Sequence, residues 1–253
     1  MKNKVWNYWN KFPDYGDMLY KRATGELGEM ECSKALSNII TTIYEKEMHI
    51  LDVGCGAGHY YRSFKTRIDP DISFTGVDIT PYYIELANKA YGDEASFSVG
   101  DIYDLDFDDE QFDIVTCNNT IPNLPPPPTS ALKELLRVSS KYVIIRTLIG
   151  KRNYVIQKLR SAEEVEISME EKDLIGEDGE LRSYNYLNMY TENYYRQILS
   201  DIETNLEAEF RRDTDFSSFD NTKNTKKEST KIVNSMQISG NLILDWHFVI
   251  IEK

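Results

Sequence analysis

Short apolar runs bounded by turn residues alternate with helical stretches through the middle of the chain. This alternation is typical of βαβ units and predicts a mainly parallel sheet. Pro81 and Thr129 provide start signals for two of the intervening helices. Helices are predicted at about 60–67, 81–91 and 129–138. Five parallel strands are predicted at Met48 to Val53, Phe74 to Val77, Ala95 to Val99, Phe112 to Thr116 and Lys141 to Thr147.

The end of the chain has a different pattern. Leu206 to Arg212 and Leu242 to Glu252 are predicted strands, and the polar stretch 221–230 lies between them without a crossover-helix pattern. Two consecutive strands with no helix between them predict an antiparallel hairpin that closes one edge of the sheet. The lysine-rich link is expected to be a solvated, mobile loop.

Two segments lie outside the alternation of strands and helices. The first contains several aromatic residues, which would either cover a ligand or pack a helix onto the sheet. The second is rich in Glu, Tyr and Asn. The predicted division is an N-terminal helical cap (1–45), an α/β core (46–149), an insertion after the fifth strand that caps the substrate (150–190), and the end of the core with its terminal hairpin (191–253).

The composition is that of an ordinary globular protein, with 41% hydrophobic and 28% charged residues. A net charge of -13 opposes binding to nucleic acids and to acidic membranes. No apolar run has the length of a signal peptide core or a membrane span, which predicts a cytoplasmic protein. Three cysteines without a CxxC pair and three scattered histidines predict no disulfide framework and no metal site.

The most informative segment joins a predicted buried strand to a glycine-rich turn and a helix. Gly54, Gly56 and Gly58 form a GxGxG pattern, which differs from the GxGxxG of dinucleotide-binding proteins. Glycines at a strand's carboxyl end let a ligand approach the backbone. Asp52 would repel a pyrophosphate there and would suit a ligand with a sulfonium and an ammonium group, such as S-adenosylmethionine. Asp52 could instead accept hydrogen bonds from the loop amides.

Polar residues also follow the next three predicted strands. Asp78 stands about twenty residues beyond the glycine loop, where a carboxylate can accept hydrogen bonds from ribose hydroxyls, although it could also cap the following helix. Asp101 would accept a hydrogen bond from an adenine amino group, with Ile102 packed on the ring. Asn118 and Asn119 would face the reactive part of the ligand.

Taken together, these segments resemble the class I S-adenosylmethionine-dependent methyltransferases, in their broad small-molecule subgroup (methyltransferase domain 11/25-like). Residues 50–58, 76–79, 100–105 and 112–115 match the patterns (I/L)LD(V/I)GCGxG, GxDI, GDxxxL and FDxV in that order. The resemblance implies a Rossmann-like, seven-stranded, mainly parallel α/β sheet whose last strand is antiparallel. It also implies S-adenosyl-L-methionine as cofactor and S-adenosyl-L-homocysteine as product. The expected cofactor-binding residues are Arg22, Asp52, Gly54, Cys55, Gly56, Gly58, Asp78, Ile79, Asp101, Ile102 and Asn118.

The residues after the fourth strand narrow the chemistry. Many members of the family carry a histidine there, and this chain has Ile121-Pro-Asn123 instead. The chain also lacks the (N/D/S)PP(Y/F) tetrapeptide and the Pro-Cys nucleophile of enzymes that methylate nucleic-acid bases. The candidate catalytic base is His59, which could alternatively point to solvent, or a carboxylate or tyrosine of the insertion. Candidate substrate-binding residues are Asn119, Asn123 and Tyr186.

The predicted function is methyl transfer to a small-molecule acceptor by O- or N-methylation, for example of a sugar or natural-product intermediate. The protein is expected to act as a monomer or homodimer, without nucleic-acid or membrane partners. Two alternatives stay open at this point: an NAD-dependent oxidoreductase, and a cofactor-binding but non-catalytic subunit of a larger complex.

Overall fold

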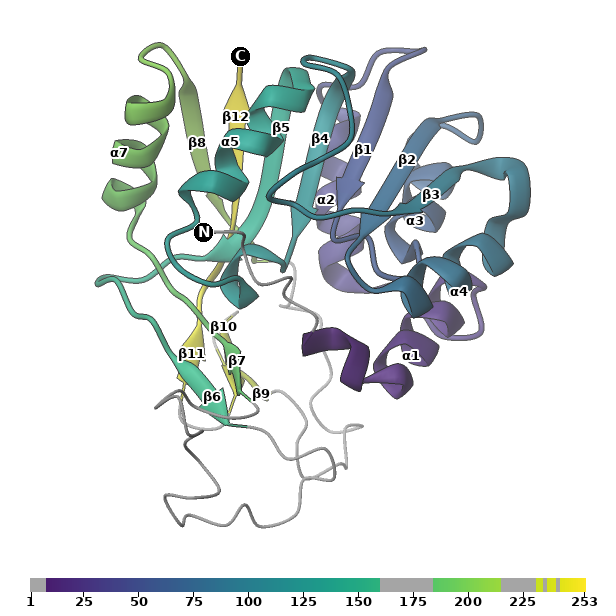
Figure 1. Ribbon diagram of the computed structural model, residues 1–253, viewed down its shortest axis with the longest axis horizontal. Coiled ribbons are helices and arrows are strands. Elements are labelled where there is room, and N and C mark those ends of the chain that lie inside the picture. Colours follow the sequence, from purple (N-terminus) through teal and green to yellow (C-terminus); the bar gives the residue numbers. More distant parts are fainter. Residues whose placement is uncertain (1–7, 160–183, 215–230, 234–235, 240–241) are drawn as a thin grey trace.

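A computed structural model describes residues 8–159, 184–214, 231–233, 236–239 and 242–253 (Figure 1). A seven-stranded sheet forms its centre, in the order β3-β2-β1-β4-β5-β12-β8. Strands β1 to β5 run parallel, and β12 is antiparallel to both of its neighbours, as predicted. The bounds are His49–Val53 (β1), Ser73–Asp78 (β2), Ser96–Val99 (β3), Phe112–Asn118 (β4), Ser139–Leu148 (β5), Glu207–Arg212 (β8) and Trp246–Glu252 (β12).

Helices cover both faces of this sheet (Figure 1). The three predicted helices form within a residue of their expected bounds, and α4 begins at Pro81, where a missing N–H costs no helical hydrogen bond. Helix α7, near the start of the segment 191–253, was not predicted. The bounds are Pro13–Ala23 (α1), Glu31–Thr41 (α2), His59–Arg67 (α3), Pro81–Tyr91 (α4), Thr129–Val138 (α5) and Glu192–Ile202 (α7).

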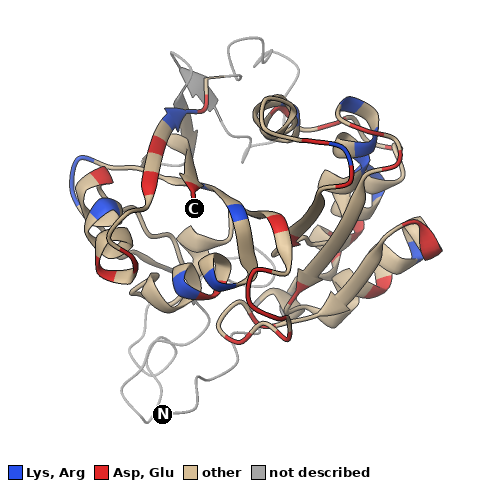
Figure 2. Cartoon of the chain, turned by 90° about the horizontal axis from the view of Figure 1, so that it is seen from above, with Lys and Arg blue, Asp and Glu red and all other residues tan. Residues whose placement is uncertain are grey.

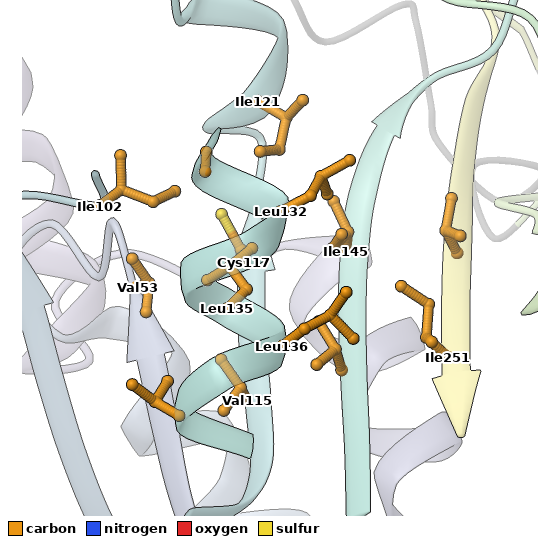
Figure 3. Close-up of a cluster of buried hydrophobic side chains, with 14 of the residues drawn as sticks. Val53, Ile102, Val115, Cys117, Ile121, Leu132, Leu135, Leu136, Ile145 and Ile251 are labelled. Carbon is orange, nitrogen blue, oxygen red and sulfur yellow. The ribbon is translucent and has the colours of Figure 1, made fainter. Parts of the chain in front are cut away.

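Successive residues of the central strands alternate between two hydrophobic clusters. Leu51 and Val143 contribute to the cluster beneath α5 and α7, whereas Ile50 and Ile144 contribute to the cluster beneath α2, α3 and α4. Figure 3 shows Leu132, Leu135 and Leu136 of α5 among the side chains of the first cluster. Because the strands are buried on both faces, their sequences are continuous apolar runs rather than alternating ones.

Helix α1 packs on α4 and α3 beside the carboxyl ends of the first strands (Figure 1). Gly16 makes the close approach possible, since a Cβ atom there would lie 2.6 Å from the ring of Tyr83. The Tyr83 hydroxyl donates to Phe12 O at 3.0 Å, and the Tyr91 hydroxyl donates to Ala23 O at 3.2 Å. The N-terminal region therefore both covers the edge of the site and packs onto the core.

The predicted terminal hairpin is confirmed in the pairing of β8 with β12, but the region between them was only partly anticipated. The predicted strand Leu242 to Glu252 is divided at Asp245, and residues before it form a separate antiparallel sheet. The polar stretch 221–230 lies outside the described residues. In the insertion, β6 (Gln157–Leu159) pairs with β7 (Tyr184–Tyr186). The smaller sheet consists of β9 (Lys231–Val233), β10 (Met236–Ser239) and β11 (Leu242–Leu244).

A buried ion pair joins the end of β5 to the residue that follows β8. Arg146 donates to Asp213 Oδ2 from Nε at 2.8 Å and from Nη2 at 2.7 Å, and both residues are 3% exposed. The guanidinium also stacks on the Trp246 ring, 4.3 Å from its centroid. The low dielectric around this pair makes the loss of either partner costly, because the other charge stays buried.

Charged residues of both signs are interspersed along the chain in Figure 2. Most ion pairs of the described residues are partly exposed, among them Arg212 Nε with Asp245 Oδ1 at 2.7 Å. No helix in the described ranges combines the length and apolarity that crossing a bilayer requires.

Asp213→Asn is expected to lower the free energy of unfolding by about 3–5 kcal/mol, because it leaves the buried Arg146 charge without its partner. Asp245→Asn is the matched control, since it breaks a partly exposed pair with Arg212 and should cost about 1 kcal/mol or less. Urea unfolding followed by circular dichroism measures both values. Equal losses in the two variants would contradict the assignment of Arg146 and Asp213 as a buried structural pair.

Candidate functional site

A cavity lies at the carboxyl ends of β1, β2 and β4, where the sequence placed the ligand. Loops after these strands and after β3 form one side, and α1 with the residues before it forms another. Parallel strands expose their last carbonyls and loops at one edge of the sheet, which is where open α/β sheets bind ligands. Of the predicted site residues, the following line the cavity: Gly54, Gly56, His59, Asp78, Ile79, Asp101, Ile102, Asn118, Asn119 and Asn123.

The glycine loop is held against β2 by its own backbone. Gly54 N and Cys55 N both donate to Val77 O, at 2.7 and 3.0 Å. Gly54 has a φ of +79°, and a Cβ atom there would lie 2.2 Å from Thr120 Oγ1. A larger residue at position 54 is therefore excluded by the backbone conformation and by contact with Thr120, whether or not a ligand is bound. Gly58 and Cys55 lie behind the cavity lining, Gly58 against Phe97 and Cys55 buried in the core.

Asp78 connects the glycine loop to the start of α4. Its Oδ2 accepts from Gly56 N at 2.9 Å, and its Oδ1 accepts from Thr80 N at 2.9 Å. Burial raises the pKa of this carboxyl, and the two backbone hydrogen bonds oppose that shift. Each oxygen keeps a lone pair for a ligand hydroxyl. The capping role and the ligand-facing position considered for Asp78 are therefore compatible.

Asp101 and Ile102 follow the carboxyl end of β3, just as Asp78 lies at the carboxyl end of β2. Asp101 Oδ1 accepts from Tyr103 N at 3.0 Å, which turns the chain back toward the cavity. Ile102 is buried in the core cluster, where Figure 3 shows it, and it also lines the cavity. Ile102 thus offers an apolar surface next to a carboxylate.

Asp52 differs from the other acids because it is buried at 1% exposure and lies behind the cavity lining. Its Oδ1 accepts from Thr116 Oγ1 at 2.7 Å, so the hydrogen bonds predicted from the loop amides are replaced by one from β4. Its Oδ2 has no hydrogen-bond partner. Burial raises the pKa of Asp52 to about 7, with a smaller contribution from the charge of Asp78.

Asn118 and Asn119 end β4 at the cavity. Asn118 is 5% exposed, and neither polar atom of its side-chain amide has a partner. Asn119 has a φ of +60°, a conformation that asparagine tolerates better than most residues. Asn123 Nδ2 donates to Asn119 O at 2.6 Å and fixes the turn. The β4 end thus presents amide groups to a ligand.

His59 lies in the cavity wall and is 9% exposed, so the alternative that it points to solvent is wrong. Its Nδ1 is buried without a partner, and its ring packs on Tyr60 with centroids 4.6 Å apart. Burial, followed by the nearby charge of Arg22, lowers the pKa of His59 to about 3. His59 is therefore neutral at pH 7 and accepts protons poorly, which weighs against a role as general base.

Arg22 lies outside the cavity lining, near His59. Its Nη1 donates to Gly28 O at 2.7 Å, and its Nε is buried without a partner. The role in cofactor binding that the resemblance implies for Arg22 stays a prediction.

The tyrosines of the insertion and α7 mostly pack on one another rather than forming a wall of this cavity. Tyr195 is fully buried, and its hydroxyl lies 2.9 Å from Thr147 Oγ1. Tyr190 contacts the rings of Tyr194 and Tyr195. Tyr186, on β7, also lies outside the cavity lining. Residues 160–183 of the insertion, with its candidate carboxylates, lie outside the described part of the chain.

Several cavity residues were not identified individually from the sequence. The aromatic density of the N-terminal segment signalled Trp9 and Tyr15, whereas Leu19, Met30 and Tyr103 follow no pattern that predicts a site. Within the described ranges, no three His, Cys, Asp or Glu side chains converge as ligands for a metal ion.

Replacing Asp52 with Asn is expected to change the pH dependence of stability. An unfolded Asp ionises near 3.8 and the folded one near 7, so the folded state loses stability as the pH rises from about 4 to about 7. At about 1.4 kcal/mol per pKa unit, Asp52→Asn should stabilise the protein by about 2–3 kcal/mol more at pH 8 than at pH 5. Urea unfolding at the two pH values measures this, with the exposed Asp93→Asn as control. The same change at both pH values would contradict a strongly shifted Asp52.

Comparisons with known proteins agree with this geometry. Residues 50–141 match a family model described as a methyltransferase domain. A protein of Aspergillus luteorubrus named as a probable methyltransferase is 32% identical over 141 residues, which cover 51% of this chain and 49% of that protein. A malonyl-[acyl-carrier protein] O-methyltransferase of Priestia megaterium is 33% identical over 86 residues, covering 34% of this chain and 31% of that enzyme. The matched segment thus spans half or less of these relatives.

Among solved structures, an S-adenosylmethionine-dependent methyltransferase of Methanosarcina mazei superposes with a TM-score of 0.56 at 19% identity. The superposition covers 85% of this chain and 96% of that one and shows a shared fold. The sheet order, the loop between β1 and α3 and the matched family model identify the same architecture. Residues 50–141 therefore match a methyltransferase domain, and the chain shares the fold of an S-adenosylmethionine-dependent methyltransferase.

Proposed function

We propose that this protein transfers a methyl group from S-adenosylmethionine to a small-molecule acceptor. The observation that carries the proposal is the position of Asp78, which lines the cavity while its carboxylate holds the glycine loop through Gly56 N. This arrangement joins the loop, the strand end and the cavity in one unit. A ligand with vicinal hydroxyl groups can use the remaining lone pairs of Asp78.

The residues of the cavity fit S-adenosylmethionine in their chemistry. Asp78 suits the ribose hydroxyls, and Asp101 with Ile102 suits the amino group and ring of adenine. Asn118 has an unsatisfied buried amide in the cavity wall, which is costly unless a ligand supplies partners. The bound cofactor supplies a methyl group on a positively charged sulfur. Because this cofactor has no phosphate group, it needs no cationic side chain to bind one. The acidic Asp52 near the site is compatible with its positive charge.

The chain's own contribution to the reaction is alignment and exclusion of water. Trp9, Tyr15 and Leu19 cover the cavity from the side of α1. Asn119 and Asn123 present polar groups where β4 ends, which suits orientation of an acceptor. Holding two reactants in line can contribute several kcal/mol to rate acceleration without a covalent intermediate.

A small acceptor is favoured over a macromolecule by two observations. The net charge of -13 opposes polyanions such as nucleic acids. The cavity is bounded by α1 as well as by the strand ends, which limits the size of a group that can enter.

Isothermal titration is expected to detect micromolar binding of S-adenosylmethionine and S-adenosylhomocysteine and no binding of NADH. Asp78→Ala should weaken binding of both by about 1–3 kcal/mol, because a buried charge-assisted hydrogen bond is lost. The exposed Asp93→Ala variant serves as the charge-matched control. Circular dichroism checks that each variant is folded. Binding of NADH alone would refute the proposed cofactor and favour an oxidoreductase.

A further inference from the structure

We infer that the methyl acceptor is a carboxylate, held by the side-chain amide of Asn119 and converted to a methyl ester. This inference rests on the proposed methyltransferase function and assigns its acceptor class. Its basis is the geometry around the end of β4, where an asparagine amide is fixed in one orientation.

Asn119 is held at nearly every polar atom. Its N donates to Arg146 O at 3.0 Å, its O accepts from Asn123 Nδ2 at 2.6 Å, and its Oδ1 accepts from Arg146 Nη1. Within the described residues, Nδ2 makes no hydrogen bond. Since Asn119 lines the cavity, this NH₂ group is the part of the side chain left for a ligand.

The orientation of the amide follows from the chemistry of its neighbour. A guanidinium only donates hydrogen bonds, so the atom that it contacts on Asn119 is the carbonyl oxygen and not the nitrogen. Arg146 is itself immobilised by Asp213 on one side and by the Trp246 ring on another. The buried ion pair thus fixes the amide with its oxygen on Arg146, which leaves the two N–H donors of Nδ2 available to a ligand in the cavity. A ligand at this place must accept hydrogen bonds.

Three cavity side chains that could otherwise serve as a base are poor proton acceptors. The hydroxyl of Tyr103 donates to Pro125 O at 3.3 Å, and that of Tyr83 donates to Phe12 O at 3.0 Å. Burial raises the pKa of Tyr103 to about 12, and it lowers the pKa of His59 to about 3. None of these three side chains takes a proton readily at neutral pH. An acceptor that is already ionised needs no such group.

The acidic residues of the cavity lie at other strands. Asp78 follows β2 and Asp101 follows β3, and both accept backbone hydrogen bonds. In the sheet order, β1 separates them from β4, where Asn119 lies. The part of the cavity at β4 is therefore lined by amides rather than by carboxylates, which suits an anionic acceptor better than a cationic one.

A carboxylate meets both requirements. It is ionised at neutral pH, and while one oxygen attacks, the other accepts from Asn119 Nδ2. In the step itself, a carboxylate oxygen forms a bond to the methyl carbon as the carbon–sulfur bond breaks. The electron pair of that bond goes to sulfur, which becomes a neutral thioether, and no proton is transferred. An amine acceptor would instead bring N–H donors to the Asn119 donors.

The contact is tested by NMR of side-chain amides in protein saturated with S-adenosylhomocysteine. Sodium acetate is the carboxylate probe, and acetamide at equal ionic strength is the neutral one. The Asn119 signal, identified by its loss in Asn119→Asp, is expected to shift with acetate and not with acetamide. Equal shifts, or none with acetate, would overturn the role of Asn119.

The acceptor class is tested by the stability of the transferred methyl group. The protein, tritiated S-adenosylmethionine and a small-molecule extract of the source cells are incubated, and alkali is then added. Methyl esters release volatile tritiated methanol, whereas N-methyl and aryl ether products do not. Alkali-stable product would overturn the carboxylate assignment alone. Absence of any transfer would overturn the proposed function, and the carboxylate assignment with it.

Asn119→Asp keeps an oxygen for Arg146 and the backbone conformation, but it replaces the two N–H donors with a negative charge. It is expected to reduce alkali-labile transfer at least tenfold while S-adenosylhomocysteine affinity changes less than twofold. Asn193→Asp, exposed on α7, adds the same charge away from the cavity and should leave transfer unchanged. Full transfer by Asn119→Asp would refute the assignment.

Discussion

The hydrogen bonds between the glycine loop and the end of β2 are the constraint on which the site depends. Val77 O accepts from two successive loop amides, and Asp78 accepts from a third at Gly56. These bonds fix where the chain leaves β1 and enters α3, and they place the Asp78 carboxylate at the cavity. Loop conformation and ligand chemistry are thus determined by one set of contacts, because the acid that faces the ligand also holds the loop.

Most of the central sheet could be predicted because its strands are buried on both faces. Such strands are short apolar runs between turn residues, and β1, β2 and β4 are all of this kind. Strands β9 and β10, which were missed, lie in a polar region where no apolar run of that length stands out. The last predicted strand is divided at Asp245 because β12 pairs with β5 only from Trp246 onward. A local sequence pattern carries no information on that pairing.

The candidate site was predictable where a residue's role follows from its place at a strand end. Asp78, Asp101 and Asn118 were found this way, and all three line the cavity. Burial was not predictable in the same manner. Burial raises the pKa of Asp52 and lowers that of His59, with a further lowering from Arg22 at His59, and this burial is created by segments far apart in the sequence. The Arg146–Asp213 pair joins residues 67 positions apart and carries no local signal.

The left-handed backbone conformation at Asn119 limits which residues can replace it during evolution. With a φ of +60°, the position accepts asparagine, aspartate or glycine at low cost, and β-branched residues only with strain. Aspartate would reverse the polarity that the position presents to the cavity, and glycine would remove the side chain altogether. Divergence at this position is therefore confined to three distinct recognition chemistries, so a change of acceptor would proceed by a discrete jump rather than by gradual drift.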